Sequence, residues 1–309
     1  MYNEDGYVVD AASQGFFKQQ LTTVMAKTYD IVYADLKAKT AFPVKATARP
    51  FDKYLIYRQF DKVGLAKIIA NYASDFPSVH IKGQEFTSNL RDIGASYGYS
   101  IKDLQASQAN QLPLVSDEAT AARRANDELA DKITWFGDAE NGLQGLFDNP
   151  NIPTITVPAD GTGSTTEWIY KTSTQILRDL NDLVNSIVEL TKEIEIPNTL
   201  MMPTSQYNLI NDKKLDSVSN TTVLQYFKST NSYVTDVVSV PILKGAGAGA
   251  SDVMVAYNKN PEKMWMEIPL DFTQETPQQI ALRFTVFCHS TCGGLIVPAP
   301  LSAAIANGI

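Results

Sequence analysis

Two long amphipathic stretches, set among strand-like segments, are the feature that most constrains the fold of this 309-residue chain. The first follows Ser116, which we expect to be the N-cap of a helix that ends at Gly137. Its expected apolar stripe is Ala122, Ala125, Leu129, Ile133 and Phe136. The second follows Thr172, which forms a capping-box pattern with Gln175, and Pro197 is expected to end it. Its apolar stripe is Ile176, Leu180, Leu183, Ile187, Leu190 and Ile194.

Strand patterns surround these two helices. Residues 53–61 are rich in aromatic and β-branched side chains, and residues 93–101 alternate between larger and smaller ones. We expect these two segments to form one long two-stranded arm, with a loop at 71–83. Further strands are expected at 198–203, 237–243, 253–257, 264–270 and 280–288, and further helices at 12–39, 205–211 and 221–229. Because helices and strands mix without a βαβ rhythm, the sequence predicts an α+β fold.

Composition excludes several classes of protein. The net charge of -8 argues against a general nucleic-acid-binding protein, which needs a basic face to displace counterions. Hydrophobic residues make up 44% of the chain, enough for a sizeable core. We expect no membrane span, because no run of about 18 apolar residues occurs. We also expect no secretory signal, because the first ten residues are acidic.

The chain offers little catalytic or metal-binding chemistry. Cys288-His289-x-x-Cys292 lacks the second ligand pair that zinc needs, so we expect two buried, unreactive thiols. The GAGAGA loop at 245–250 matches neither common phosphate-binding pattern and is expected to be a hairpin loop. We predict no enzymatic activity, no cofactor and no metal site. The competing hypothesis is an enzyme with a cofactor pocket around this loop.

Several segments together resemble one family. The segment YRQFDKVGLAKIIANYASDFP (57–77) resembles the Y-x-x-[YF]-D-x-x-G-x-A-x-I pattern of tailed-phage and prophage major capsid proteins. Relatives of that family include the encapsulin nanocompartments. The segment LRDIGASYGYSIKDLQASQA (90–109) resembles the strand that leads into the family's long spine helix. The matching residues there are Tyr97, Tyr99, Ser100, Asp103, Leu104 and Ser107.

The resemblance continues downstream in the family's order. Residues 121–152 carry an F-G-x4-G-x2-G-L-x-[ND] run, and PNTLMMP with QYNLI, within 197–210, resembles the start of the family's axial domain. The residues of the glycine-rich run are Phe136, Gly137, Gly142, Gly145, Leu146 and Asp148.

The resemblance implies the Hong Kong 97-type capsid fold. Its parts would be an N-terminal arm (1–48), an extended E-loop (49–101), a peripheral domain with the spine helix (102–165 with 262–309) and an axial domain (166–261). The implied function is a structural major capsid protein that self-assembles into an icosahedral shell enclosing phage DNA. The alternative is an encapsulin-type nanocompartment shell that packages cargo enzymes.

The resemblance also implies partners and a location. The chain would assemble with itself into hexamers and pentamers, work with scaffolding and portal proteins, and touch packaged DNA only non-specifically. It lacks the long charged N-terminal extension of some relatives, and Met1 favours a separate scaffolding protein. We expect it in the virion, and in the host cytoplasm during assembly.

Two sets of residues are the candidate contact sites. The E-loop set, expected between subunits, is Tyr57, Arg58, Phe60, Asp61, Lys62 and Gly64. Gly245, Gly247 and Gly249 are expected in a mobile loop at the capsomer axis, where alanine substitutions should cost little in folding. Lys62 and Lys67 lie where some relatives form covalent cross-links, but no pattern selects an Asn acceptor, so we predict no cross-link.

Charge is unevenly distributed along the chain. Residues 36–70 contain eight basic and two acidic groups, a net charge of +6, which leaves -14 on the remainder. We therefore predict that the arm and E-loop dock electrostatically on acidic neighbouring subunits, with Arg58 and Lys62 as the sharpest candidates.

Overall fold

The computed structural model describes residues 35–63, 80–110, 114–216 and 220–309. Its helices are α2 (Ala38–Ala41), α3 (Ile101–Asn110), α4 (Leu114–Phe136), α5 (Ser173–Leu190), α6 (Thr204–Asp212) and α7 (Val223–Thr230). Short 3₁₀ turns are η1 (Trp168–Tyr170), η2 (Pro241–Leu243), η3 (Ala248–Ala250) and η4 (Pro300–Ser302). The strands are β1 (Val44–Lys45), β2 (Tyr54–Val63), β3 (His80–Asn89), β4 (Arg91–Ser100), β5 (Thr154–Thr156), β6 (Thr199–Met202), β7 (Asp236–Ser239), β8 (Val253–Tyr257), β9 (Trp265–Glu267), β10 (Leu270–Gln274), β11 (Gln278–Ile280), β12 (Arg283–Cys292), β13 (Leu295–Ile296) and β14 (Ala303–Asn307).

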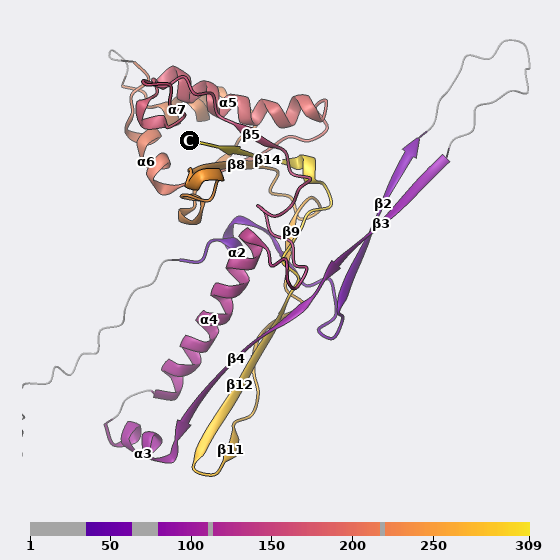
Figure 1. Cartoon of the computed structure of the whole chain (residues 1–309), viewed down its shortest axis with the longest axis vertical. Helices are drawn as coiled ribbons and strands as arrows, with labels where there is room; N and C mark the ends of the chain where they lie inside the picture. Colours follow the sequence, from indigo (N-terminus) through magenta and orange to yellow (C-terminus); the bar gives the residue numbers. More distant parts are fainter. Residues whose placement is uncertain (1–34, 64–79, 111–113, 217–219) are drawn as a thin grey trace, which may run out of the picture. The chain divides into compact units, whose positions relative to one another are not determined.

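A five-stranded sheet in the order β5-β14-β8-β6-β7 separates two apolar clusters. Val255 and Tyr257 of β8 belong to one cluster, whereas Met254 and Ala256 belong to the other. Because both faces are covered, all five residues of β8 are buried and its sequence shows no polar alternation. Helix α5 covers one face (Figure 1). The sheet draws strands from both sides of the expected domain boundaries, which themselves stay a prediction.

Helix α5 starts as the sequence predicts and ends earlier. Thr172 and Gln175 form the complete capping box. The helix stops at Leu190, so the expected continuation to Pro197 is wrong. Lys192 and Glu193 take left-handed backbone conformations with φ of 52° and 66°, which a helix cannot contain. The last predicted stripe positions therefore leave the core, with Leu190 56% exposed and Ile194 79% exposed.

Helix α4 buries a face that only partly matches the predicted stripe. It begins at Leu114, so Ser116 is not its N-cap but lies inside it. Buried Asn126 turns the helix, because it donates to Ile93 O (3.4 Å) and accepts from Ser290 Oγ (2.7 Å). Of the predicted stripe, Ala122 and Ile133 are buried, while Ala125, Leu129 and Phe136 are exposed. The other buried positions of the helix are Asn126, Ala130, Asp131, Thr134 and Trp135. Gly137, with φ of 71°, donates to Ile133 O and ends the helix as predicted.

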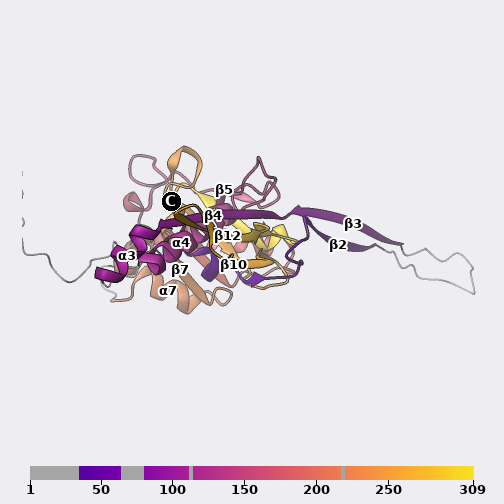
Figure 2. The same ribbon diagram turned by 90° about the horizontal axis from the view of Figure 1, so that it is seen from below.

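The two-stranded arm exists, but its second strand is not the predicted one. Strand β2 pairs antiparallel with β3, which begins at His80 inside the expected loop. Strand β4 pairs along its full length with β12 instead. Only Leu90 separates β3 from β4, so they run as one line from the hairpin into the sheet (Figures 1 and 2). Side chains alternate between two faces in β3 and β4 alike, so the sequence pattern does not identify the strand with which each of them pairs.

Three other expectations need correction. The strand at 237–243 ends at Ser239 and becomes η2 at Pro241, because proline cannot donate to a sheet. The strand at 280–288 is broken by a turn at Ala281 (φ 54°), which leaves Ile280 and Leu282 exposed. The predicted helix 12–39 lies outside the described residues up to position 34, and residues 35–37 are not helical.

The glycine-rich run after α4 permits a close backbone approach. A Cβ on Gly145 would stand 2.2 Å from the backbone nitrogen of Gly137. We expect Gly145→Ala to lower the free energy of unfolding of the unassembled chain by about 1–3 kcal/mol or more. Gly94→Ala is the control, because its Cβ would meet nothing nearer than 4.0 Å. Urea unfolding followed by circular dichroism measures both, and equal losses would contradict this account of Gly145.

Candidate assembly surfaces

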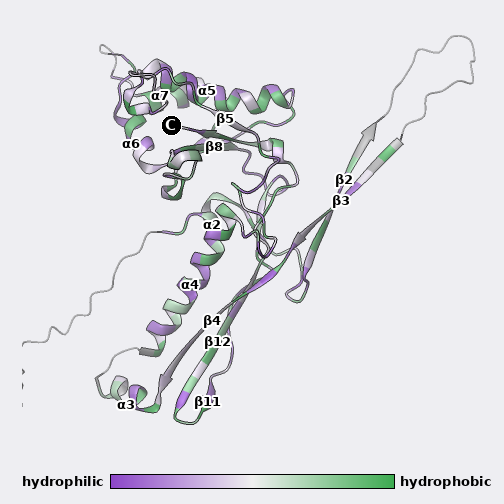
Figure 3. Cartoon of the chain, viewed as in Figure 1, coloured by the Kyte–Doolittle hydropathy of each residue, from purple (hydrophilic) through white to green (hydrophobic). Residues whose placement is uncertain are grey.

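The hairpin of β2 and β3 presents two different faces. Its register pairs Tyr54 with Asn89 and Phe60 with Gly83, so alternate residues share a face. We call the face that carries Tyr54, Ile56, Arg58 and Phe60 the outer face, and the opposite one the inner face. Figure 3 shows hydrophobic and hydrophilic residues mixed along both strands. The two faces differ in what they contact within the chain.

The inner face packs against the chain's own body. The rings of Tyr57 and Phe86 stack with centroids 5.3 Å apart, and burial raises the pKa of Tyr57. Gln59 donates a hydrogen bond to Pro298 O. Between the hairpin and the body lies a cavity of about 400 Å³ lined by Tyr57, Gln59, Phe86, Gln144, Asn149 and Val297, among others. Tyr57 and Gln59 therefore position the hairpin on its own subunit.

The outer face is exposed and carries four large apolar or aromatic side chains beside the Arg58–Glu85 ion pair. Exposure reaches 57% for Tyr54, 56% for Ile56, 63% for Phe60 and 65% for Ile81. The Phe60 ring covers Gly83, where an added Cβ would lie 3.2 Å from the ring. Two strands alone are marginally stable in water. This face therefore lacks, within the described part of the chain, the cover that a hairpin of this kind needs.

The predicted E-loop residues divide between these faces. Tyr57 is on the inner face, and Arg58 and Phe60 are on the outer face. Arg58 Nε lies 2.7 Å from Glu85 Oε1, so its charge already has a partner within the hairpin. The backbones of Asp61 and Lys62 lie in β2, while their side chains and the whole of Gly64 lie outside the described residues.

A buried carboxylate that sequence reasoning missed anchors the base of the hairpin. Glu267 is fully buried and accepts from Thr47 N (2.5 Å), Ala48 N (2.9 Å) and Trp265 Nε1 (2.7 Å). These bonds fix the segment that leads from β1 into the hairpin. The sequence did contain a signal for this buried carboxylate, because Glu267 interrupts the apolar run MWMEIPL. An acidic residue in such a run needs hydrogen-bond or ion-pair partners when it is buried.

The Gly/Ala loop before β8 lies at the surface and is more constrained than its composition suggests. Asp252 Oδ1 accepts from Gly245 N at 3.0 Å. Gly245 and Gly249 have φ of 66° and 69°, and a Cβ on Gly247 would lie 2.7 Å from Ser251 Oγ. The expectation that alanine substitutions there cost little is therefore wrong. The loop leads into strand β8, as predicted.

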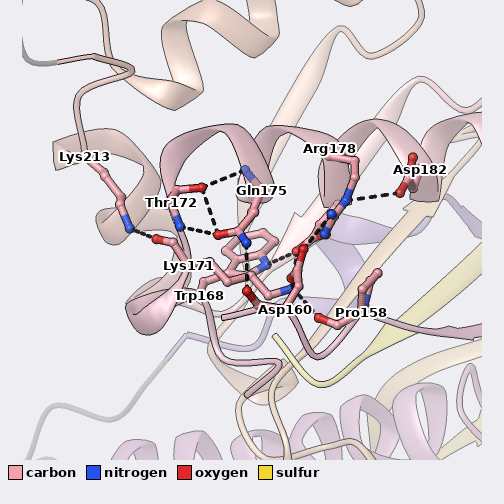
Figure 4. Close-up of polar contacts among 10 residues, drawn as sticks. Pro158, Asp160, Trp168, Lys171, Thr172, Gln175, Arg178, Asp182 and Lys213 are labelled. Atoms are coloured by element: carbon pink, nitrogen blue, oxygen red, sulfur yellow. Dashed lines mark hydrogen bonds and ion pairs between the residues drawn. The ribbon is translucent and has the colours of Figure 1, made fainter. Parts of the chain in front are cut away.

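A second missed feature is a buried charge network beneath the loop that precedes α5 (Figure 4). Lys171 Nζ and Asp179 Oδ2 are 2.7 Å apart, and both side chains have no exposed surface. Asp179 also accepts from Trp168 Nε1 (3.2 Å) and Arg178 (2.7 Å). Arg178 donates to Asp160 Oδ2 at 2.6 Å and holds the pKa of that carboxyl at about 2. The network ties the loop to the first turns of the helix.

The burial of the two cysteines agrees with the sequence prediction. Cys288 and Cys292 are both buried and unpaired with each other, and burial raises the pKa of each thiol. Among the described residues, no group of His, Cys, Asp and Glu side chains could hold a metal ion. No helix in the described ranges is both long enough and apolar enough to cross a membrane.

Solved structures from phage and GTA particles have a similar fold. The capsid of Myoviridae phage XM1 matches with a TM-score of 0.79 and 16% identity over 98% of this chain and 100% of that one. The structure of Mycobacterium phage Bobi matches with a TM-score of 0.63 and 11% identity over 97% of this chain and 99% of that one. The capsid of an empty GTA particle matches with a TM-score of 0.61 and 10% identity over 97% of this chain and 98% of that one. The fold is thus that of tailed-phage shell subunits, the Hong Kong 97-type fold.

Sequence comparison gives the family. The family model described as major capsid protein matches residues 64–309. No curated protein sequence matches the chain. The chain belongs to the major capsid protein family, and its role is structural: it is a shell-forming protein.

The Glu267 anchor gives a stability prediction. Glu267→Gln replaces one acceptor oxygen by a donor, so one of three buried N–H groups loses its partner. We expect a loss of about 1–3 kcal/mol in the free energy of unfolding of the unassembled chain. Glu262→Gln is the control, because that side chain is 80% exposed in its ion pair with Lys45 and should cost under about 1 kcal/mol. Similar losses in both variants would contradict the anchor.

The charge network gives a pH prediction. Because the folded-state pKa of Asp160 is lowered to about 2, its contribution is complete above the unfolded pKa of about 4 and fades as the pH falls towards 2. Asp160→Asn should therefore flatten the loss of stability between about pH 4 and pH 2. Asp182→Asn, in the more distant 3.7 Å pair with Arg178, is the control. Parallel pH profiles for parent and Asp160→Asn would refute the assignment.

Proposed function

We propose that the chain assembles into hexamers and pentamers that close an icosahedral shell around phage DNA. The observation that carries the proposal is the exposed apolar outer face of the hairpin, with Ile56, Phe60 and Ile81 each more than half exposed. A neighbouring subunit would cover this face. The contact would be heterologous, with the hairpin of one copy on the body of the next, and such contacts form rings when the rotation closes.

Apolar contact supports this docking better than charge does. Three of the basic groups in residues 36–70 already pair with acids of their own chain: Lys39 with Asp127, Lys45 with Glu262 and Arg58 with Glu85. Such exposed pairs are worth about 0.2–1 kcal/mol each. Burying an apolar side chain such as Phe60 contributes about 1.5–3 kcal/mol. The hairpin would therefore be held mainly by its apolar residues, with charge steering the encounter.

The remaining partners follow from the proposed shell. Gly245, Gly247 and Gly249, on their surface loop, would lie near the axis of each capsomer. The net charge of -8 supports only non-specific contact with packaged DNA. Scaffolding and portal proteins would control assembly in the host cytoplasm, and the chain would carry no catalytic activity. Nucleic acid in purified shells would support a phage capsid, whereas a protein cargo would support the encapsulin alternative.

The outer face can be tested by substitution. Phe60→Ser with Ile81→Ser should abolish shells and capsomers, because the neighbour loses two apolar contacts. Phe51→Ser is the matched control, since Phe51 is 73% exposed and lies outside the hairpin strands, and it should assemble like the parent. Light scattering and negative-stain microscopy measure assembly. Normal shells from the double variant would overturn the role of this face.

A companion variant separates charge from apolar contact. Arg58→Glu with Lys62→Glu should slow assembly at low salt and leave its yield near the parental level at about 0.15 M salt, where the Debye length is near 8 Å. Loss of assembly at every salt concentration would show that charge holds the hairpin.

A further inference from the structure

An exposed apolar pair stands at the N-terminal end of α5. In η1, Ile169 is 66% exposed and Tyr170 is 52% exposed. Their chain neighbours on both sides, Trp168 and Lys171, are buried at 0% and 2%. The chain thus turns one residue inward, two outward and one inward again. We call Ile169 and Tyr170 the η1 knob.

The buried charge network holds the knob in place (Figure 4). Trp168 and Lys171 both bond the same oxygen, Asp179 Oδ2, at 3.2 and 2.7 Å. The backbone of Tyr170 is also fixed, since its N donates to Glu167 O (3.1 Å) and its O accepts from Thr162 N (3.0 Å). A buried ion pair is a weak source of stability but fixes geometry. An apolar pair held this firmly loses little conformational entropy when it meets a partner.

An apolar groove lies at the opposite end of the same helix. It has a volume of about 510 Å³, and its lining includes Leu190, Ile194, Glu195, Pro298 and Leu301. Leu190, Ile194 and Leu301 are 56%, 79% and 43% exposed. The left-handed turn after α5 places Ile194 here rather than in the core. We call this the α5 groove.

One residue that lines the α5 groove, Glu195, carries an unsatisfied acceptor. Glu195 is only 7% exposed, and its Oε1 pairs with Lys263. Its other oxygen, Oε2, is buried and has no hydrogen-bond partner. A buried carboxylate oxygen without a donor costs free energy that a partner's O–H or N–H group can recover.

We propose that the η1 knob of one subunit docks in the α5 groove of the next, with the Tyr170 hydroxyl donating to Glu195 Oε2. The inference rests on the proposed function, because the occupant is a second copy of this chain. Helix α5 has 18 residues and separates knob from groove by about 27 Å at 1.5 Å per residue. Two complementary patches at opposite ends of one rigid element are what a head-to-tail ring contact requires.

Complementarity favours a second copy over another occupant. The groove offers aliphatic side chains and, at Glu195 Oε2, an acceptor that lacks a donor. The knob supplies one aliphatic side chain and one aromatic hydroxyl donor. A knob and a groove on one chain also cannot satisfy each other within that chain, because α5 holds them apart. Each subunit would then use both patches, one on either side.

Disulfide trapping in the full chain tests the contact. Tyr170→Cys with Ile194→Cys in one chain should give, on oxidation of assembled protein, a ladder of cross-linked oligomers. Because assembly holds the two thiols at high effective concentration, we expect about tenfold more cross-linked product than from a control pair. The control pair is Tyr170→Cys with Leu282→Cys, a 72% exposed position in the turn before β12. The native Cys288 and Cys292 are buried and do not compete.

Variants with one substitution each provide further tests of the contact. A mixture of Tyr170→Cys chains and Ile194→Cys chains should stop at dimers, because each chain then carries only one half of the contact. Tyr170→Phe should assemble more weakly than the parent, and Glu195→Gln should behave likewise, if the hydroxyl bonds Oε2.

The possible outcomes distinguish a failure of this contact from a failure of the proposed function. Light scattering of the parent reports assembly, and the ladder reports the contact. Assembly without a ladder, or with equal ladders from both pairs, overturns the contact and leaves the proposed function standing. Absence of assembly in the parent overturns both. A ladder from the 170–194 pair alone establishes the contact.

Discussion

The structure depends on one strand that changes its partner at Leu90. Upstream it pairs with β2 in the hairpin, and downstream it pairs with β12 through ten residues. Leu90 is 3% exposed and packs so closely on Gly293 that an added Cβ would lie 2.7 Å from its side chain. The same Cβ would lie 3.1 Å from Glu267, whose carboxylate holds the segment entering the hairpin. Both strands of the hairpin are therefore fixed at one crossing, and the direction of the hairpin follows from it.

Buried polar side chains stand at the other places where separate segments meet. Asp131 of α4 accepts from Ala38 N at 2.8 Å and so holds α2 against the long helix, although burial raises the pKa of this carboxyl. Lys171 and Asp179 perform the same task for the loop before α5. Buried charges of this kind add little net stability. Their placement indicates that this fold uses them to fix where one segment joins another.

Sequence patterns predicted what depends on local chemistry. The capping box at Thr172, the helix end at Gly137 and the buried strand β8 follow from side chains within a few residues. The sequence patterns failed where the local structure depends on residues far away in the chain. The partner of β4 depends on β12, nearly 200 residues later, and the buried face of α4 depends on Asn126 meeting Ser290. The candidate site was predicted as a region, but alternation alone could not show which hairpin face the body covers.

Exposed apolar side chains in the described structure occur in separate places rather than in one patch. Phe60 lies on the hairpin, Ile169 beside α5, Ile194 beyond its other end and Leu282 in the turn before β12. Each contributes at most about 1.5–3 kcal/mol when covered, which is too little to hold two subunits against the entropy of association. Several such contacts must therefore form together, and a ring or shell satisfies them at once. Weak, dispersed contacts also let a misplaced subunit leave, so a closed and regular shell can form by correction.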